Sequence, residues 1–391
     1  MRRFSVAVVA SLLLTPCLAD PAGAAATSVT PAVVADRSPS GAQCRDYFFP
    51  VTMSASESTT YQVFGRLCAE GSPDGRTIQV LLHGGTYNHH YWDWPFEPDR
   101  YSYVKVATRA GFATLALDRL GYGHSDHPPS WALDYDANAW VVHQVVRYLR
   151  AGAVGRPFER VILVGHSVGG FTTFTAAGRY PDDADGIIVS GASHVLNWPG
   201  IMPAAAAFHP VEQDPKYGDG RAVPHGAGYL TTRPGRRCEA LYHGPGVDPA
   251  VCVLDEELKD TIAFGEMATF GYAAQRRSPS DRIVAPTLVV LGDYDRLMCD
   301  RTCSDPQSSA AREREFYPNA ASYDQYVEPE SGHMNNLHRT APEWFRVAVD
   351  WAARRVGSSA NSHRDLQRSQ QEGESYGPQE HSYPLPRRHR G

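Results

Sequence analysis

One short segment of the sequence combines a nucleophilic side chain with the small residues that a tight turn requires. Residues 165–169 read Gly-His-Ser-Val-Gly, and they stand between an apolar run at 161–164 and a stretch of helical spacing at 171–179. A sharp strand-to-helix turn crowds the neighbouring backbone, so small residues are needed two positions before and after the serine. Such a turn lifts the hydroxyl to a helix N-terminus, where free amides favour a developing negative charge. The pattern therefore predicts that Ser167 is a nucleophile.

A serine hydroxyl is a weak nucleophile, so Ser167 needs a general base. His333 is the predicted base, because it stands on a loop between a strand-like run at 323–327 and a final helix around 344–354. A histidine on so late a loop reaches over the turn that carries the serine. His338 is the alternative, and it fits less well because it lies near the start of the last helix.

The base in turn needs a carboxylate that fixes its tautomer and stabilises the imidazolium. Asp295 is the predicted acid, since it follows the apolar run 287–291 in a Gly-Asp-Tyr-Asp segment. Asp293 in the same segment is the nearby alternative. Asp300 is less favourable, because it stands between a cysteine and an arginine.

A negative charge that develops on a substrate carbonyl needs two backbone N–H donors. Val168, directly after the nucleophile, is one predicted donor. The other is expected on the loop after the apolar run 78–82, at Gly85 or alternatively at Thr86, because glycines at 84 and 85 let the backbone approach a substrate closely. Residues 87–92, which follow, are expected to line the acyl or alcohol pocket.

Short apolar runs alternate with segments of helical spacing along most of the chain. This alternation indicates an α/β fold with a parallel sheet buried on both faces. Function usually sits at the carboxyl ends of such strands, and the segments named above follow these runs. The apolar runs lie at residues 78–82, 112–117, 161–164, 187–189 and 287–291.

The alternation breaks between residues 193 and 281, which are rich in Pro, Gly, His and Tyr. We interpret this stretch as a cap or lid insertion over the sheet, with a long disordered loop as the alternative. Together with the segments around it, this divides the chain into six parts. They are a signal peptide (1–26), a flexible leader (27–43), a first core part (44–192), the cap (193–281), a second core part (282–356) and a disordered tail (357–391).

Taken together, these features resemble the α/β-hydrolase superfamily over roughly residues 45–356. The shared features occur in the order that the family uses, with the serine first, then the acid, then the histidine. The resemblance implies an eight-stranded, mostly parallel sheet flanked by helices, with a cap often inserted after the sixth strand. The matching segments are His-Gly-Gly at 83–85, the turn-rich residues 118–125, the serine turn, the acid segment at 292–295 and Gly-His at 332–333.

The residue at the turn also separates branches of this superfamily. Its haloalkane dehalogenases and epoxide hydrolases have an aspartate there, so Ser167 indicates acyl transfer. Its cofactor-free haloperoxidases and hydroxynitrile lyases keep a Ser-Asp-His set, so the three residues do not exclude them. The segment at 83–86 lacks the longer glycine run of one lipase group, which favours a single backbone donor from that loop.

The N-terminus and the cysteines indicate export. Two arginines precede an apolar run at residues 4–14, and small residues follow, as in a secretory signal. A lipoprotein anchor at Cys17 is the alternative, although the proline directly before it argues against this. If Cys17 is removed, six cysteines remain, and an even number in an exported chain suggests disulfides. Proximity favours Cys44–Cys68, Cys238–Cys252 and Cys299–Cys303, with a zinc site as the weaker alternative.

Charge and composition restrict the partners. The formal net charge of -6 gives no general attraction to nucleic acid or to anionic lipid, and no apolar stretch after the signal is long enough for stable membrane insertion. We expect no cofactor and no metal. The alternative is a metal site built on neighbouring histidines, with nothing that fixes the ligand spacing. Its candidate ligands are His89, His90, Asp93, His124 and His127.

The sequence thus predicts a secreted serine hydrolase that cleaves a carboxylic ester, or a related acyl bond, in a small-molecule or lipid-like substrate. Ser167, His333 and Asp295 form its triad, and Gly85 and Val168 form its oxyanion hole. Two alternatives stay open. One is a lyase or eliminase that uses the same triad on a small natural product, and the other is a non-catalytic binding protein on a hydrolase scaffold.

Overall fold

A computed structural model describes residues 29–31, 38–221, 223–224, 226–275, 279–299 and 305–359. The expected signal peptide lies outside these residues, and so do most of the expected tail, Asp300 and Cys303. Of the expected leader, the structure describes residues 29–31 and 38–43.

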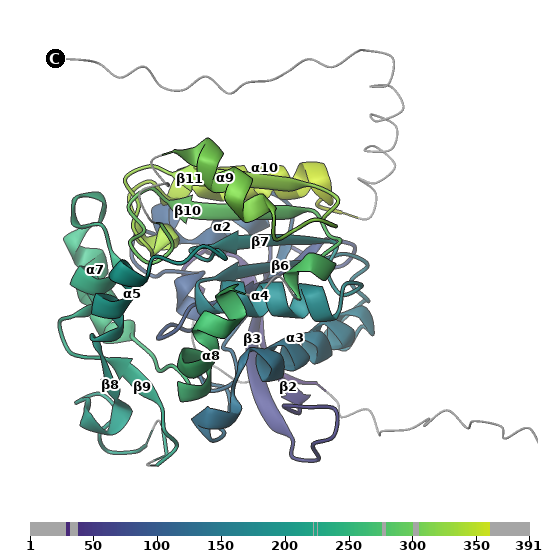
Figure 1. Cartoon of the computed structure of the whole chain (residues 1–391). Helices are drawn as coiled ribbons and strands as arrows, with labels where there is room; N and C mark the ends of the chain where they lie inside the picture. Colours follow the sequence, from purple (N-terminus) through teal and green to yellow (C-terminus); the bar gives the residue numbers. More distant parts are fainter. Residues whose placement is uncertain are drawn as a thin grey trace, which may run out of the picture.

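A large sheet runs through the centre of the described chain (Figure 1). Its strand order is β1-β2-β3-β5-β4-β6-β7-β10-β11. β3 runs antiparallel to both of its neighbours, whereas β5, β4, β6, β7, β10 and β11 all run parallel. β1 is a two-residue strand at one edge, so the predicted eight-stranded, mostly parallel sheet is confirmed. The strands are β1 (Thr30–Pro31), β2 (Gln43–Val51), β3 (Tyr61–Ala69), β4 (Ile78–Leu82), β5 (Ala113–Leu117), β6 (Val161–His166), β7 (Gly186–Ser190), β10 (Thr287–Gly292) and β11 (Tyr323–Glu328).

Helices cover both faces of this sheet, as its continuous apolar strands require. Alternate residues of β4 show the division. Ile78, Val80 and Leu82 pack with α3 and α4 on one face, while Leu81 packs with α2 and α10 on the other. The helices are α1 (Pro98–Tyr101), α2 (Tyr103–Arg109), α3 (Tyr135–Arg150), α4 (Val168–Arg179), α5 (Trp198–Ala205), α6 (Arg237–Leu241), α7 (Pro249–Leu258), α8 (Phe264–Gln275), α9 (Pro306–Arg314) and α10 (Ala341–Arg355).

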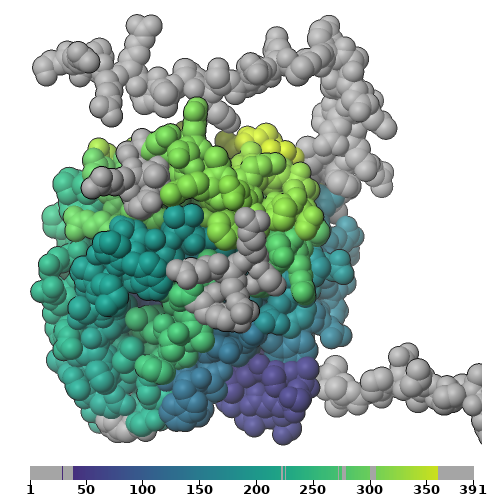
Figure 2. Space-filling model, in the orientation of Figure 1, coloured from purple at the N-terminus to yellow at the C-terminus, as the bar shows by residue number. Residues whose placement is uncertain are grey.

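The chain between β7 and β10 leaves the sheet and folds into elements of its own. These are the helices α5, α6, α7 and α8 and a small antiparallel pair, β8 (Phe208–Pro210) with β9 (Leu230–Thr232). In Figure 1, α5, α7, β8 and β9 gather on the left, beyond the ends of the large strands. In Figure 2 the same part of the chain, in teal, forms the left side of the molecular surface. We call residues 193–281 the cap from here on.

Two disulfides each join a pair of described cysteines. Cys44–Cys68 links directly paired residues of β2 and β3, and Cys238–Cys252 links α6 to α7. Two of the three expected pairs are therefore formed, and the third lies outside the described residues because it includes Cys303. The four bonded cysteines have no thiolate to offer a metal, which removes them from the zinc alternative.

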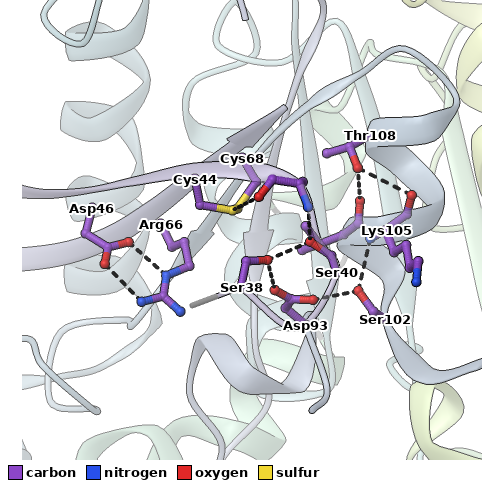
Figure 3. The surroundings of a disulfide bond; sticks show 12 residues. Ser38, Ser40, Cys44, Asp46, Arg66, Cys68, Asp93, Ser102, Lys105 and Thr108 are labelled. Carbon is purple, nitrogen blue, oxygen red and sulfur yellow. Dashed lines mark hydrogen bonds and ion pairs between the residues drawn. A yellow bond between two sulfur atoms is a disulfide. The ribbon is translucent and has the colours of Figure 1, made fainter. Parts of the chain in front are cut away.

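The surroundings of the Cys44–Cys68 bond show how Ser38 is held (Figure 3). Ser38 donates to one oxygen of the buried Asp93 carboxylate (2.6 Å), and Ser102 donates to the other (2.7 Å). Residue 38, which belongs to the expected flexible leader, thus packs against the core. No helix among the described residues is long and apolar enough to cross a membrane.

Candidate active site

Ser167 stands on the turn between β6 and α4, with φ of 52° and ψ of -118°. A positive φ is rare for a residue with a side chain and persists only where the surroundings enforce it. The two glycines of the motif explain how the turn closes. A Cβ atom on Gly165 would lie 2.3 Å from the Gly169 carbonyl oxygen, and one on Gly169 would lie 2.1 Å from the Leu82 carbonyl oxygen. The spacing that predicted the turn is therefore a steric requirement of it.

His333 and Asp295 meet Ser167 at the carboxyl ends of the strands. The Ser167 hydroxyl lies 2.8 Å from His333 Nε2, and His333 Nδ1 lies 2.9 Å from Asp295 Oδ2. The second carboxylate oxygen of Asp295 accepts from the backbone N–H groups of Leu297 and Met298. The structure thus brings the three predicted residues into one hydrogen-bonded chain, in which the histidine donates to the acid and can accept the serine proton.

The rival residues have other partners. Asp293 accepts a hydrogen bond from the Ser331 N–H (3.1 Å), which holds the loop that carries His333. Burial lowers the pKa of His338 to about 4, so its ring is neutral. His338 Nδ1 donates to the Met334 carbonyl, and its Nε2 accepts from two backbone N–H groups. Both rivals therefore support the His333 loop and do not reach Ser167, and Asp300 lies outside the described residues.

The loop after β4 decides between the two candidate oxyanion donors. The Thr86 N–H donates to the Thr261 carbonyl oxygen of the cap (2.8 Å), so it is not free for a substrate. Gly85 remains, and it lies next to Val168, because a Cβ atom placed on it would come within 3.3 Å of the Val168 side chain. Both residues border the same cavity as Ser167.

His83 fixes the direction in which the Gly85 N–H points. Burial, together with the nearby Arg119 charge, lowers the pKa of His83 to about 3, so its ring is neutral. Nε2 accepts from the Arg119 N–H (3.0 Å), and Nδ1 therefore donates to the Gly84 carbonyl oxygen (2.8 Å). In a trans peptide the carbonyl and the following N–H point in opposite directions. Holding the Gly84 carbonyl therefore turns the Gly85 N–H away from His83.

An apolar cavity of about 90 Å³ lies beside Ser167. Most of its lining comes from the cap, and among the described residues that line it, His333 is the only titratable one. The sequence indicated where the cap lies but not which cap residues line the cavity. The apolar sequence of α5 was the one signal that could have indicated some of them. The lining residues are Gly85, Ser167, Val168, Ile201, Ala204, Ala205, Phe208, Leu241, Ile262, Met267, Phe270, Leu297, Met298, His333 and Met334.

The segment 87–92 was expected to line this pocket, and that expectation is wrong. Tyr87, Tyr91 and Trp92 are buried in the apolar cluster that packs α2 and α10 against the sheet. Large aromatic rings gain most from burial, and these three rings are buried in the core and are not among the residues that line the cavity.

The neighbouring histidines form a hydrogen-bonded cluster around Asp118. His89 Nδ1 lies 2.8 Å from one oxygen of this carboxylate, and His124 Nδ1 lies 3.1 Å from the other. The backbone N–H groups of both histidines also donate to the carboxylate. The three side chains lie close enough to hold a metal ion, but the atoms that face one another already share hydrogen bonds. The cluster as it stands ties together the loops after β4 and β5.

Glu328, at the end of β11, supports the loop that carries His333. Its carboxyl group accepts from Asn335 Nδ2 and from the Thr340 hydroxyl, each at 2.9 Å. Burial raises the pKa of Glu328 to about 8. The group is therefore neutral at pH 7, which avoids leaving an unpaired charge inside the protein.

We expect the replacement Asp295→Asn to lower kcat for an ester substrate by about 10⁴-fold. The amide would favour the His333 tautomer that carries its proton on Nε2, which cannot accept the Ser167 proton. The matched change Asp293→Asn should lower kcat less than about tenfold, since an amide oxygen still accepts from Ser331. Steady-state kinetics of the two purified variants make the comparison. Equal losses would contradict the choice of Asp295.

We also expect stability to depend on Glu328 between pH 4.5 and about 8. Its folded pKa of about 8 lies above its ordinary value of 4.5, so the native state binds the proton more tightly and stability falls as the pH rises through this window. The loss amounts to about 4 kcal/mol. Urea unfolding at pH 5.5 and pH 8.5 should show a clearly smaller difference for Glu328→Gln than for the unchanged protein. The same pH dependence in both proteins would rule out this assignment.

Comparison with known proteins agrees with this fold. Residues 79–348 match the model of the Alpha/beta hydrolase family. Among curated proteins, an epoxide hydrolase 3 from Xenopus tropicalis is 32% identical over 117 residues, which are 30% of this chain and 28% of that protein. A 2-(acetamidomethylene)succinate hydrolase from Mesorhizobium japonicum is 34% identical over 107 residues, which are 27% of this chain and 32% of that protein. The chain thus matches about a third of the length of these relatives.

A solved structure, that of the monoacylglycerol lipase of Paleococcus ferrophilus, superposes on 75% of this chain and 99% of the other, with a TM-score of 0.51 and 20% identity. At that identity the superposition shows the fold. The family model covers more than half of this sequence, and the strand order, the serine turn and the curated relatives, which are themselves hydrolases, agree with it. This protein belongs to the alpha/beta hydrolase family.

Proposed function

We propose that this protein is a secreted serine hydrolase that cleaves a carboxylic ester by way of an acyl-enzyme. The observation that carries the proposal is the continuous chain from Ser167 through His333 to Asp295, with contacts of 2.8 and 2.9 Å. Ser167 in place of an aspartate supports acyl transfer over epoxide opening. The two disulfides support an oxidising compartment such as the cell exterior.

Each residue has one role in the proposed reaction. Ser167 Oγ attacks the ester carbonyl carbon while His333 Nε2 takes the hydroxyl proton, and Asp295 stabilises the imidazolium. The N–H groups of Gly85 and Val168 bind the oxygen that becomes negative, which lowers the barrier by about 3 kcal/mol for each donor. His333 then protonates the leaving alcohol. Water, deprotonated by His333, attacks the acyl-serine and releases the acid.

The cavity supports an uncharged, apolar acyl group in a small or lipid-like ester. A carboxylate buried among Ile201, Phe270 and Met298 would have no described charged partner in the lining. Burial of an unpaired charge costs several kcal/mol, so the same site is poorly suited to acids such as succinate. We therefore propose that the substrate of this protein differs from the succinate derivative in the name of its relative, the 2-(acetamidomethylene)succinate hydrolase.

The replacement Ser167→Ala should lower turnover of a p-nitrophenyl ester by about 10⁴-fold or more, because the acyl-enzyme cannot form. A fluorophosphonate probe should label the unchanged protein on Ser167 and leave the variant unlabelled. The exposed Ser56→Ala is the matched control and should keep both turnover and labelling. Ester turnover that survives in folded Ser167→Ala would falsify the assignment.

The acyl pocket can be tested on the two faces of α5. Ala204 borders the cavity, whereas Met202 on the same helix is 63% exposed. Ala204→Phe should fill the cavity and lower kcat/KM for p-nitrophenyl hexanoate about tenfold or more relative to the acetate ester, since overpacking costs about 1–3 kcal/mol. Met202→Phe adds a similar ring on the outer face and should leave this ratio within twofold. An unchanged ratio in Ala204→Phe would place the acyl chain elsewhere.

A further inference from the structure

The helices α6 and α7 of the cap form a cross-linked unit next to the proposed active site. The Cys238–Cys252 disulfide joins the two helices. The fully buried Arg237 guanidinium forms two parallel contacts of 2.9 Å with the Asp255 carboxylate. Planar two-point pairs of this kind fix orientation as well as charge. The disulfide and the ion pair therefore give this unit, residues 237–258, a defined internal geometry.

The first contact of this unit with the site reaches the loop after β4 that carries Gly85, Thr86 and Tyr87, which we call the oxyanion loop. Arg237 Nη1 donates to the Thr86 hydroxyl (2.8 Å), and that hydroxyl donates to the Gly85 carbonyl oxygen (2.6 Å). Thr86 has φ of 62°, which is an unusual conformation for a β-branched residue and needs surroundings that hold it. Arg237 thus fixes the peptide that follows Gly85, just as His83 fixes the peptide before it.

The second contact reaches the loop that carries His333. The His333 N–H donates to the carbonyl oxygen of Leu241, the last residue of α6 (3.1 Å). The His243 N–H donates to His338 Nε2 (3.1 Å), which also accepts the Gly332 N–H. One short segment, residues 237–243, therefore contacts both Thr86, the neighbour of the proposed oxyanion donor Gly85, and the backbone of the proposed base His333.

Two tyrosines connect these contacts through the same carboxylate. Tyr87, on the oxyanion loop, donates to Asp255 Oδ2 (2.9 Å), and Tyr242, directly after α6, donates to the same oxygen (2.8 Å). The Arg237 guanidinium lies over the Tyr87 ring, 4.6 Å from its centre. Every polar group of this network is buried, so each member depends on the others for its hydrogen bonds.

We propose that the α6–α7 unit positions the oxyanion loop and the His333 loop relative to one another, with Arg237 as its positioning residue. This inference rests on the ester hydrolysis proposed above. An oxyanion donor must lie within a few tenths of an ångström of its place to stabilise the transition state. The oxyanion loop follows β4 and the His333 loop follows β11, and β6, β7 and β10 lie between these two strands in the sheet. Asn336 hydrogen-bonds directly to Tyr91 between the loops, and the α6–α7 unit adds a second link that reaches Thr86 and the His333 backbone.

Thr86 offers a test with little change in side-chain volume. Thr86→Val keeps the size and branching of the side chain but removes the hydroxyl between Arg237 and Gly85. We expect kcat for p-nitrophenyl butyrate to fall about tenfold while KM stays within twofold, because the lost interaction acts on the transition state. Thr86→Ser restores the hydroxyl and should recover most of kcat. Equal kcat in the Val and Ser variants, or a loss confined to KM, would overturn the proposal.

A second pair of variants tests Arg237 itself. Arg237→Lys keeps the charge but cannot bind both Asp255 oxygens and Thr86 at once, so we expect kcat to fall by 10- to 100-fold with little change in KM. Arg66→Lys is the matched control, because Arg66 forms the same kind of two-point pair with Asp46, and this pair joins β3 to β2 (Figure 3). Similar kcat values for the two lysine variants, both folded by circular dichroism, would overturn the proposal.

Labelling separates this inference from the proposed function. If the positioning role holds, the fluorophosphonate probe still modifies Ser167 in Thr86→Val and in Arg237→Lys, but at a lower rate than in the unchanged protein. If the unchanged, folded protein shows neither ester turnover nor labelling at Ser167, the proposed function fails and the positioning role fails with it.

Discussion

The hydrogen bond of 2.8 Å between the Ser167 hydroxyl and the His333 ring joins residues that are 166 positions apart. It depends on the parallel arrangement of β6, β7, β10 and β11, because parallel neighbours bring the loops at their carboxyl ends to one edge of the sheet. It also depends on the strained turn at Ser167, which raises the hydroxyl out of the sheet. The oxyanion loop, the cap and Asp295 also begin at this edge, because they follow β4, β7 and β10.

The substrate side of that edge is held by buried polar groups. Asp118 ties the loops after β4 and β5 through His89 and His124, and Arg119 forms a buried ion pair with Glu266 of α8. Arg237 of α6 and Asp255 of α7 form another buried ion pair within the cap. Buried charges are costly unless they are paired and hydrogen-bonded, so each of these pairs accepts few alternative arrangements. The Arg119–Glu266 pair therefore attaches the cap to the core in a defined orientation, while the other groups fix the loops and the inside of the cap.

The cavity beside Ser167 has the opposite character. Its walls are apolar, and its polar atoms belong to the groups that would act on an ester. Keeping the ionic contacts outside the cavity leaves an environment of low dielectric constant around the developing charge, where two N–H donors act more strongly than in water. The chain thus separates the polar network that fixes the geometry from the apolar surface that we propose as the acyl site.

The sequence by itself determined the features that depend on near neighbours. Glycines two positions from Ser167 are required by contacts within the turn, and the short apolar runs are required by burial on both faces of the sheet. The fold class and the strand-to-helix turn at Ser167 could therefore be predicted from them. Only the tertiary structure showed that Asp295 contacts His333, that His333 contacts Ser167, and that the Thr86 N–H donates to a carbonyl of the cap. These contacts depend on which side chain or amide meets a partner from a distant segment, as the Thr86 N–H meets Thr261. The cavity lining and the Arg237 network were decided in the same way, because the cap residues that form them acquire their neighbours only when the chain is folded.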